Sequence, residues 1–332
     1  MAAGARNRDA TRFHVVSGKG GTGKTTVAAA LALHLASGGR RVLLIEVEGR
    51  QGIAQLFDVP PLPYEERKVA IARGGGDVFA LAVDPEAALY EYLDMYYRLG
   101  RAGRALQRFG VVEFATTVAP GVRDVLLTGK AYEAVRRRDD QRFAYDAVVL
   151  DAPPTGRIGR FLNVNTEVAG LTKVGPIRRQ ADAIMGLLHS PRTAVHLVTL
   201  LEEMPVQETA DAVAELSSLH IPVGMLVVNQ TRTPILDPDR LAAARTDGLD
   251  SGEIKAGLHE AGLGSHGELV DALRQEARGH AERVELEERE RLELARLRLP
   301  MVELPWLADG IDLAALYELA DRIGDATGGA AP

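Results

Sequence analysis

The chain has 332 residues, of which 46% are hydrophobic and 26% are charged, a composition typical of a globular protein with a substantial core. It contains no cysteine, which excludes disulfides, thiolate zinc sites and cysteine nucleophiles. The formal net charge of −7 argues against bulk electrostatic attraction to nucleic acid, so no nucleic-acid partner is expected.

The N-terminal residues 1–12 are polar and charged, and they lack the apolar segment of a signal peptide. We therefore expect a disordered arm there. No apolar run in the sequence approaches the roughly 20 residues that cross a bilayer. The expected location is the cytoplasm, with a peripheral position at a membrane as a further option.

The stretch from Gly18 to Thr26 lies between an apolar run at 13–16 and a helix-like run at 27–35. The phosphate-loop pattern G-x-x-x-x-G-K-[ST] is matched there, in the required strand, loop and helix setting, by Gly18, Gly23, Lys24 and Thr25. Glycines let successive backbone N–H groups point at one anion, and the helix behind them adds its positive end. We therefore expect phosphate groups to be bound by Gly18, Lys19, Gly20, Gly21, Thr22, Gly23, Lys24, Thr25 and Thr26.

Two side chains of this loop carry predicted chemistry. Lys24 should lie along the β- and γ-phosphate oxygens, and the Thr25 hydroxyl should ligate Mg²⁺. The predicted cofactors are therefore ATP and Mg²⁺, and zinc is not expected.

Lys19 is a second lysine in the loop that the general pattern does not require. The form K-G-G-x-G-K-T-T resembles the phosphate loop of the family that contains nitrogenase iron protein, the MinD and ParA partition ATPases, and the ArsA arsenite ATPase with its tail-anchored-protein-targeting relatives. In that family the early lysine crosses a dimer interface to the partner's nucleotide. The resemblance implies a catalytic role for Lys19 in a dimer, and a solvated loop lysine is the alternative.

Residues 41–47 are predicted to form a buried parallel strand, because a continuous apolar run follows a helix and two glycines. The segment from Leu43 to Phe57 most resembles the ArsA and targeting branch, whose Leu-Leu-Ile-Ser-Thr-Asp-Pro-Ala-His segment places Glu48 on the catalytic aspartate of switch I. That aspartate orients or deprotonates the attacking water, so the resemblance implies this role for Glu48. Its side chain is a methylene longer, and Gly49-Arg50-Gln51 replaces Pro-Ala-His. A slow base, a structural or magnesium-shell carboxylate and a surface carboxylate all stay open.

Residues 60–76 are predicted to form a loop because proline and glycine interrupt them, and residues 78–83 a strand. Mainly helical patterns follow from 86 to about 138. In the family this region is a helical subdomain, and the resemblance implies such elements at about 85–140 and 160–190. In targeting members it forms a groove for a hydrophobic client, which here would be lined by Leu93, Met95, Tyr96, Tyr97, Met185, Leu187 and Leu188. Such apolar helix faces are also typical of an ordinary core.

The apolar strand predicted at 145–150 ends at Asp151, where a carboxylate suits the magnesium shell. The segment Asp151-Ala-Pro-Pro-Thr-Gly-Arg resembles switch II of the family, so Asp151 is implied in catalysis and, with Thr25, in metal binding. The Pro-Pro-Thr-Gly part can move when the γ-phosphate leaves. Arg157 replaces the family's histidine, and the role of that histidine does not carry over.

Further elements are predicted in the second half of the chain, with strands at 194–199, 222–228 and 301–305, a helix from 205, and a closing helix at 313–323. His196 is predicted to be an interior or edge histidine with its hydrogen bonds satisfied. In ArsA-like proteins an asparagine after the corresponding strand reads the adenine edge, which implies this role for Asn229; an asparagine that merely starts a loop is the alternative. Pro305 matches the Leu-Pro turn near the adenine.

Residues 237–282 are polar and charged and are read as an insertion. They stand where targeting members carry a Cys-x-x-Cys zinc clasp, and without cysteine a zinc-clasped homodimer is impossible. Residues 282–298 alternate acidic and basic side chains, a pattern that favours a solvated helix with internal ion pairs over a partner site.

These patterns predict a doubly wound, mainly parallel α/β sheet of the P-loop NTPase type with a helical insertion, in a single ArsA-like domain over 13–332. The resemblance implies an Mg²⁺-dependent dimeric ATPase, either a homodimer or, as in some bacterial branches, a heterodimer with a paralogous chain. Its output would be the handling of a hydrophobic or membrane-destined protein segment, or the driving of an anion-transport partner at a membrane. The alternatives are a catalytically weak ATP-binding subunit that assembles with a paralogue, and a MinD- or ParA-like positioning ATPase.

Overall fold

The computed structural model describes residues 11–97, 120–171, 176–264 and 266–327, and all structural statements concern these residues. Their main sheet has eight strands in the order β10-β9-β8-β1-β7-β2-β4-β3. Neighbouring strands pair in parallel except β3, which runs antiparallel to β4. The strands are β1 (Phe13–Gly18), β2 (Arg41–Glu46), β3 (Arg67–Ile71), β4 (Asp77–Ala82), β7 (Ala147–Asp151), β8 (Thr193–Thr199), β9 (Val223–Thr231) and β10 (Met301–Pro305), with a separate hairpin of β5 (Arg138–Asp139) and β6 (Arg142–Phe143).

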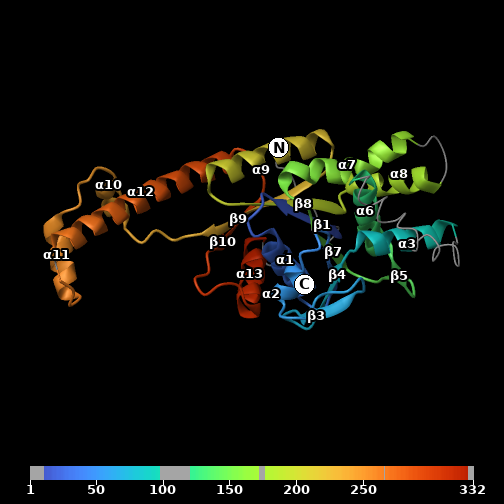
Figure 1. The fold of residues 1–332 in the computed structure, drawn as a ribbon, viewed down its shortest axis with the longest axis horizontal. Coiled ribbons are helices and arrows are strands. Elements are labelled where there is room, and N and C mark those ends of the chain that lie inside the picture. The colour runs from blue at the N-terminus through green and yellow to red at the C-terminus, as the bar shows by residue number, and fades with distance from the viewer. Residues whose placement is uncertain (1–10, 98–119, 172–175, 265, 328–332) are drawn as a thin grey trace.

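Helices cover both faces of this sheet (Figure 1). Buried side chains of α1, α2 and α13 pack on one face, and those of α6, α7, α8 and α9 pack on the other. The fold is therefore a doubly wound α/β sandwich, which confirms the predicted class. The helices are α1 (Lys24–Ala36), α2 (Gly52–Leu56), α3 (Pro85–Tyr97), α6 (Pro120–Arg136), α7 (Thr155–Leu171), α8 (Pro176–Leu188), α9 (Glu203–Ser218), α10 (Pro238–Arg245), α11 (Ser251–Glu260), α12 (Gly267–Ala295) and α13 (Leu313–Ala326).

The central strands are buried on both faces, which explains their continuous apolar sequences. In β2, Leu43 and Ile45 belong to the core on the α6 to α9 side, whereas Val42 and Leu44 belong to the core on the α1 side. Burying one such side chain contributes about 1.5–3 kcal/mol. The sheet is therefore a firm support for the loops at the carboxyl ends of its strands.

Two of the predicted loops are strands. The predicted loop at 60–76 contains β3, a half-exposed edge strand whose pairing with β4 shifts register between Lys68 and Ala70. Edge strands of this kind lack the continuous apolar run that marks a buried strand, so the sequence pattern missed it. The strand predicted at 222–228 continues as β9 to Thr231, which places Asn229 inside the strand instead of in a following loop.

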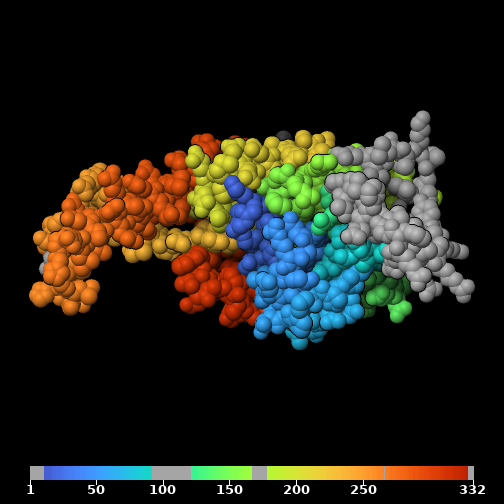
Figure 2. All heavy atoms as spheres, in the orientation of Figure 1, coloured from blue at the N-terminus to red at the C-terminus, as the bar shows by residue number. Residues whose placement is uncertain are grey.

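The helices α10, α11 and α12 form an arm that projects from the body of the molecule (Figures 1 and 2). The arm, residues 238–295, has a small apolar cluster of its own, made by Leu241, Ala244 and Ala281. The predicted insertion boundary at 282 lies within α12, which runs unbroken to Ala295. Among the described helices, none is both long enough and apolar enough to cross a bilayer.

The helical side next to β4 and β7 contains α3, α6, α7 and α8 (Figure 1). Met185, Leu187 and Leu188 are buried there in the subunit core, so the prediction that they line a client groove is wrong. The other proposed groove residues, Leu93 to Tyr97, have side chains outside the described set, as does the helical pattern at 98–119. Residues 1–10 of the predicted arm are also outside it, whereas the Arg12 guanidinium donates to the Tyr145 carbonyl.

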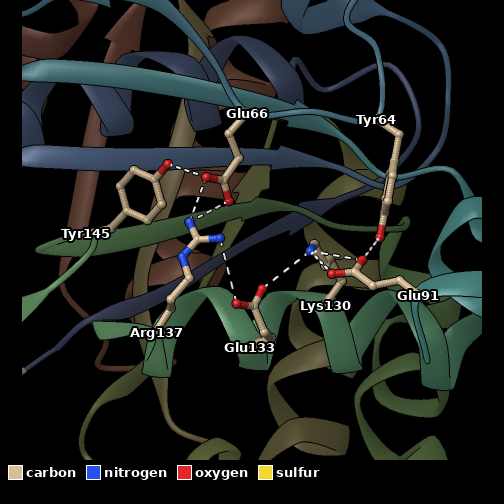
Figure 3. Close-up of polar contacts among 7 residues, drawn as sticks. All are labelled: Tyr64, Glu66, Glu91, Lys130, Glu133, Arg137 and Tyr145. Carbon is tan, nitrogen blue, oxygen red and sulfur yellow. Dashed lines mark hydrogen bonds and ion pairs between the residues drawn. The ribbon is translucent and has the colours of Figure 1, made fainter. Parts of the chain in front are cut away.

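A chain of polar contacts ties α3 and α6 to the edge of the sheet (Figure 3). The Lys130 ammonium on α6 lies 2.8 Å from Glu91 on α3, and Arg137, just after α6, lies 2.6 Å from Glu66. Burial is the main cause that raises the pKa of the two tyrosines at the ends of this chain, so each holds its proton more tightly than a solvent-exposed tyrosine does. The seven residues are Tyr64, Glu66, Glu91, Lys130, Glu133, Arg137 and Tyr145.

Candidate functional site

The phosphate loop connects β1 to α1 at the middle of the sheet. A Cβ at Gly18 would lie 2.1 Å from the carbonyl oxygen of Val198, so the neighbouring strand β8 requires glycine there. Gly21 and Gly23 have φ angles of +89° and +85°, which glycine adopts without strain. A Cβ at Gly20 or Gly21 would meet no atom within 4 Å, so the space over the loop is open.

The N-terminus of α1 faces this loop without a side-chain cap. The first backbone N–H groups of a helix have no intrahelical acceptor, and the helix dipole makes this end positive. Lys24, the first helical residue, is only 9% exposed and adds a full positive charge. The loop therefore fits an anion such as a phosphate group.

Asp151, the last residue of β7, lies beside the start of α1. Its Oδ2 accepts a 2.7 Å hydrogen bond from the Thr25 hydroxyl, while its buried Oδ1 has no hydrogen-bond partner in the described part of the chain. Burial raises the pKa of Asp151 to about 6, against the opposing effects of Thr25 and Lys24. A buried carboxylate oxygen without a partner, next to a hydroxyl, offers the oxygen ligands that Mg²⁺ prefers, so these residues fit the predicted metal.

Two more carboxylates lie at or just after the end of β2, and their charges also raise the pKa of Asp151. Glu46 is 2% exposed and accepts hydrogen bonds from the backbone N–H groups of Gly52 and Ile53 at the start of α2. Glu48 is more accessible and faces the Arg50 guanidinium at 3.8 Å. Glu46 is thus held by two backbone N–H groups, whereas Glu48 has only the longer contact with Arg50 among the contacts described for it.

Asn229 and Pro305 come together because β9 and β10 are paired next to the loop. The Asn229 side-chain amide donates a 2.8 Å hydrogen bond to the carbonyl oxygen of Thr22. A Cβ at Gly23 would lie 2.3 Å from the same amide nitrogen, so Asn229 supports the loop from behind. Trp306, directly after Pro305, is 46% exposed and lies under the Arg232 guanidinium at 4.4 Å from the ring centroid.

Lys19 lies on the outer side of the loop, where its ammonium is 3.0 Å from Glu208 of α9. The other oxygen of Glu208 accepts a 3.0 Å hydrogen bond from the Thr155 hydroxyl at the start of α7. Lys19 also borders a cavity of about 470 Å³ between the loop and the segment from Leu200 to Pro205. The loop, switch II and α9 therefore meet at one carboxylate.

The start of α6 contacts both segments that resemble switches. The Arg123 guanidinium donates to the carbonyl oxygen of Val47 at 3.4 Å, in the switch I segment. Asp124 lies 3.6 Å from Arg157, the residue that replaces the family's histidine in switch II. Because α6 also carries Lys130, it links these segments to the polar chain of Figure 3.

The sequence model of the anion-transporting ATPase family matches residues 11–191, more than half of the chain. The protein belongs to this ArsA-type ATPase family. The ATPase BagA of Mycobacterium tuberculosis is 55% identical over 317 residues, which cover 94% of this chain and 92% of that protein. The ATPase get3 of Schizosaccharomyces japonicus is 24% identical over 68% of this chain and 75% of its own, and the arsenical pump-driving ATPase of Acidiphilium multivorum is 26% identical over 69% and 41%.

This ArsA-type chain is an ATP-hydrolysing enzyme. Several of the residues predicted from the sequence to form its site lie close together in the structure. Thr25 and Asp151 touch, Lys24 and Glu48 both act electrostatically on Asp151, and Asn229 touches the loop. No role was predicted for Glu46 or Glu208. Glu46 ends an apolar strand beside the loop, which marks it as lying at the ligand-binding edge of the sheet, whereas nothing in the pattern around Glu208 marks it.

Proposed function

We propose that this protein is an Mg²⁺-dependent ATPase whose site is completed across a dimer and whose switch movements act on another molecule. The proposal rests mainly on one observation: an open phosphate loop meets Thr25 and an Asp151 oxygen that has no hydrogen-bond partner among the described residues. The dimer partner is a second copy of this chain or a paralogous ArsA-type chain. The molecule acted on is a hydrophobic or membrane-destined protein segment, or an anion-transport partner.

The phosphate loop would bind the nucleotide. Backbone N–H groups from Gly20 to Thr26 face the phosphates, and Lys24 stabilises the charge that develops on the γ-phosphate. The adenine would lie toward Asn229 and Pro305. One N–H of the Asn229 amide binds the loop, which leaves its second N–H and its side-chain oxygen available to recognise the base.

Thr25 and Asp151 would hold Mg²⁺, directly or through water. When bound with ATP, this ion supplies charge neutralisation between the β- and γ-phosphates. The raised pKa of Asp151 is consistent with this role, since it reflects a carboxylate that burial has left short of positive partners.

Glu48 would orient the attacking water or accept its proton. Its accessibility and its long contact with Arg50 leave it able to reorient, whereas Glu46 is held by two backbone N–H groups. Glu48 is therefore the better candidate for a base. Departure of the γ-phosphate would then release the switch segments, which α6 touches through Arg123 and Asp124.

A second candidate function is an ATP-binding subunit with weak turnover that serves mainly to assemble with a paralogue. The observation that favours it is the sequence after Glu48, where Gly49-Arg50-Gln51 gives the switch I segment no proline and a base one methylene too long. A displacement of about 1 Å can lower a rate about 100-fold.

Steady-state Mg²⁺-ATP hydrolysis over a range of protein concentrations separates the two candidates. A motor that completes its site by dimerising should gain specific activity with concentration and lose it in Glu48→Gln. The matched control is Glu65→Gln, which removes the same charge from an exposed ion pair with Arg67. ATP binding without turnover at any concentration would reject the motor and favour the assembly subunit.

A further inference from the structure

The contact between Lys19 and Glu208 has a consequence for the proposed dimer. The Lys19 ammonium is within 3.0 Å of one Glu208 oxygen, and the side chains are 32% and 33% exposed. While the Lys19 ammonium is paired with Glu208, its charge is compensated within its own subunit, which weakens its attraction to a nucleotide on a partner subunit. Opening the pair would free this charge to act across an interface.

Glu208 is also bonded to the segment that resembles switch II. The Thr155 hydroxyl, which is buried, donates a 3.0 Å hydrogen bond to the second oxygen of Glu208. Thr155 is the first residue of α7 and follows the Asp151-Ala-Pro-Pro segment directly. Movement of that segment would therefore shift Thr155 and, through this hydrogen bond, the Glu208 carboxylate that holds Lys19.

We propose that Glu208 is a latch that holds Lys19 within the unpaired subunit and releases it when an ATP-bound partner docks. This rests on the proposed function, in which Lys19 reaches the partner's nucleotide. The cavity of about 470 Å³ that Lys19 borders gives the ammonium space to leave Glu208. Glu208 is thus a positioning residue, which acts through Lys19 and Thr155 and does not itself touch the nucleotide.

The latch has the strength of a reversible contact. Partly exposed ion pairs such as this one change equilibria only roughly twofold to fivefold, since water and salt screen both charges. Docking of a charged nucleotide can therefore compete for Lys19 without a large barrier. The attraction between Lys19 and Glu208 should also weaken as ionic strength rises.

The test compares Glu208→Gln with Asp211→Asn. Glutamine keeps an oxygen for Thr155 but removes the charge that attracts Lys19. Asp211 lies one turn further along α9, is exposed, and accepts its hydrogen bond from Gln207, so its variant removes the same charge from the same helix without touching Lys19. The chain has six lysines, so the reactivity of each toward an amine-modifying reagent can be followed by peptide mass spectrometry.

Two readouts are taken on the full chain. Without nucleotide, Glu208→Gln should raise the labelling rate of Lys19 about twofold to fivefold, while Asp211→Asn leaves it at the wild-type rate. With Mg²⁺ and a non-hydrolysable ATP analogue, Glu208→Gln should shift the dimerisation midpoint, measured by sedimentation velocity, to a lower concentration by a similar factor.

Equal labelling of Lys19 in all three proteins would overturn the latch. Faster labelling of Lys19 in Glu208→Gln without any change in the dimerisation midpoint would also overturn it, because the contact would then be a fixed structural pair. If the wild-type chain never dimerises with nucleotide, alone or with a paralogue, both the latch and the proposed function fail. The labelling rates then show separately whether Lys19 and Glu208 are in contact in solution.

Discussion

The phosphate-loop end of the sheet and the arm of α10, α11 and α12 are held together in different ways. Around the loop, β1, β7 and β8 are buried along nearly their whole length, and residues far apart in sequence touch within hydrogen-bond distance. The arm has a three-residue buried cluster and exposed ion pairs such as Arg278 with Glu282. The loop end is held by contacts between distant segments. Apart from the end of α12, where Leu294 joins the main core, the arm is held mainly by contacts among its own helices. The same substitution should therefore have different effects in the two regions.

Removal of a lysine side chain should give the largest contrast. Lys24→Ala is expected to lower ATP turnover by about 10²–10³-fold, because a buried charge at the phosphate loop is lost. Lys255→Ala, on exposed α11, should leave turnover at the wild-type level. Steady-state hydrolysis measures both, and equal losses would mean that the loop is not where phosphate is bound.

Acid should weaken the core through a buried histidine pair. His14 Nδ1 and His196 Nε2 lie 3.0 Å apart in β1 and β8. Burial lowers the pKa of His14 to about 4 and holds the pKa of His196 well below its usual 6.5. A hydrogen bond with the Thr11 backbone opposes this lowering of the His14 pKa, and electrostatic effects of His34 and Arg40 add to it. As pH falls below about 6.5, the unfolded chain binds protons at His14 before the folded chain does. The free energy of unfolding is therefore highest above about pH 6.5 and decreases as pH falls toward 4.

The loss attributable to His14 should reach about 3 kcal/mol between pH 7 and pH 4. Urea unfolding across this pH range measures it. The double variant His14→Leu with His196→Leu should show a shallower fall over the same range, since carboxylates then provide the remaining slope. A wild-type stability that stays flat between pH 6.5 and 4.5 would contradict the assignment.

Gly18→Ala should destabilise the fold by about 1–3 kcal/mol, because the new methyl group would meet the Val198 carbonyl oxygen 2.1 Å away and force β1 from β8. Thermal and urea unfolding both detect a loss of this size. If stability is unchanged, the two strands do not pack as closely as described.

The same substitution in the arm should have the opposite sign and the smallest effect. Gly257 lies inside α11, where an added Cβ meets nothing within 4 Å, so Gly257→Ala should stabilise that helix by about 0.5–1 kcal/mol. Slower amide hydrogen exchange confined to α11 is the expected signature. A change that spreads to β1 or β8 would show that the two regions are coupled.

The sequence predicted the loop end of the sheet well and the arm poorly, for physical reasons. A phosphate loop needs glycine, lysine and threonine at fixed spacing, and a doubly buried strand needs an unbroken apolar run, so both leave local signals. The edge strand β3 and the polar helix α12 leave weak ones, because neither buries a full face. Contacts such as that of Lys19 with Glu208 join residues that are far apart in the sequence and meet only through tertiary packing. No local sequence pattern predicts them.

In the proposed dimer, each site uses Lys24 from its own chain and Lys19 from its partner. Mixing Lys19→Ala with Lys24→Ala chains tests it, because a mixed dimer would carry one intact site. With random pairing of two copies, hydrolysis should recover to about a quarter of the wild-type value, although each variant alone is inactive. No activity above that of the separate variants, under conditions where the wild-type chain turns over ATP, would contradict the account.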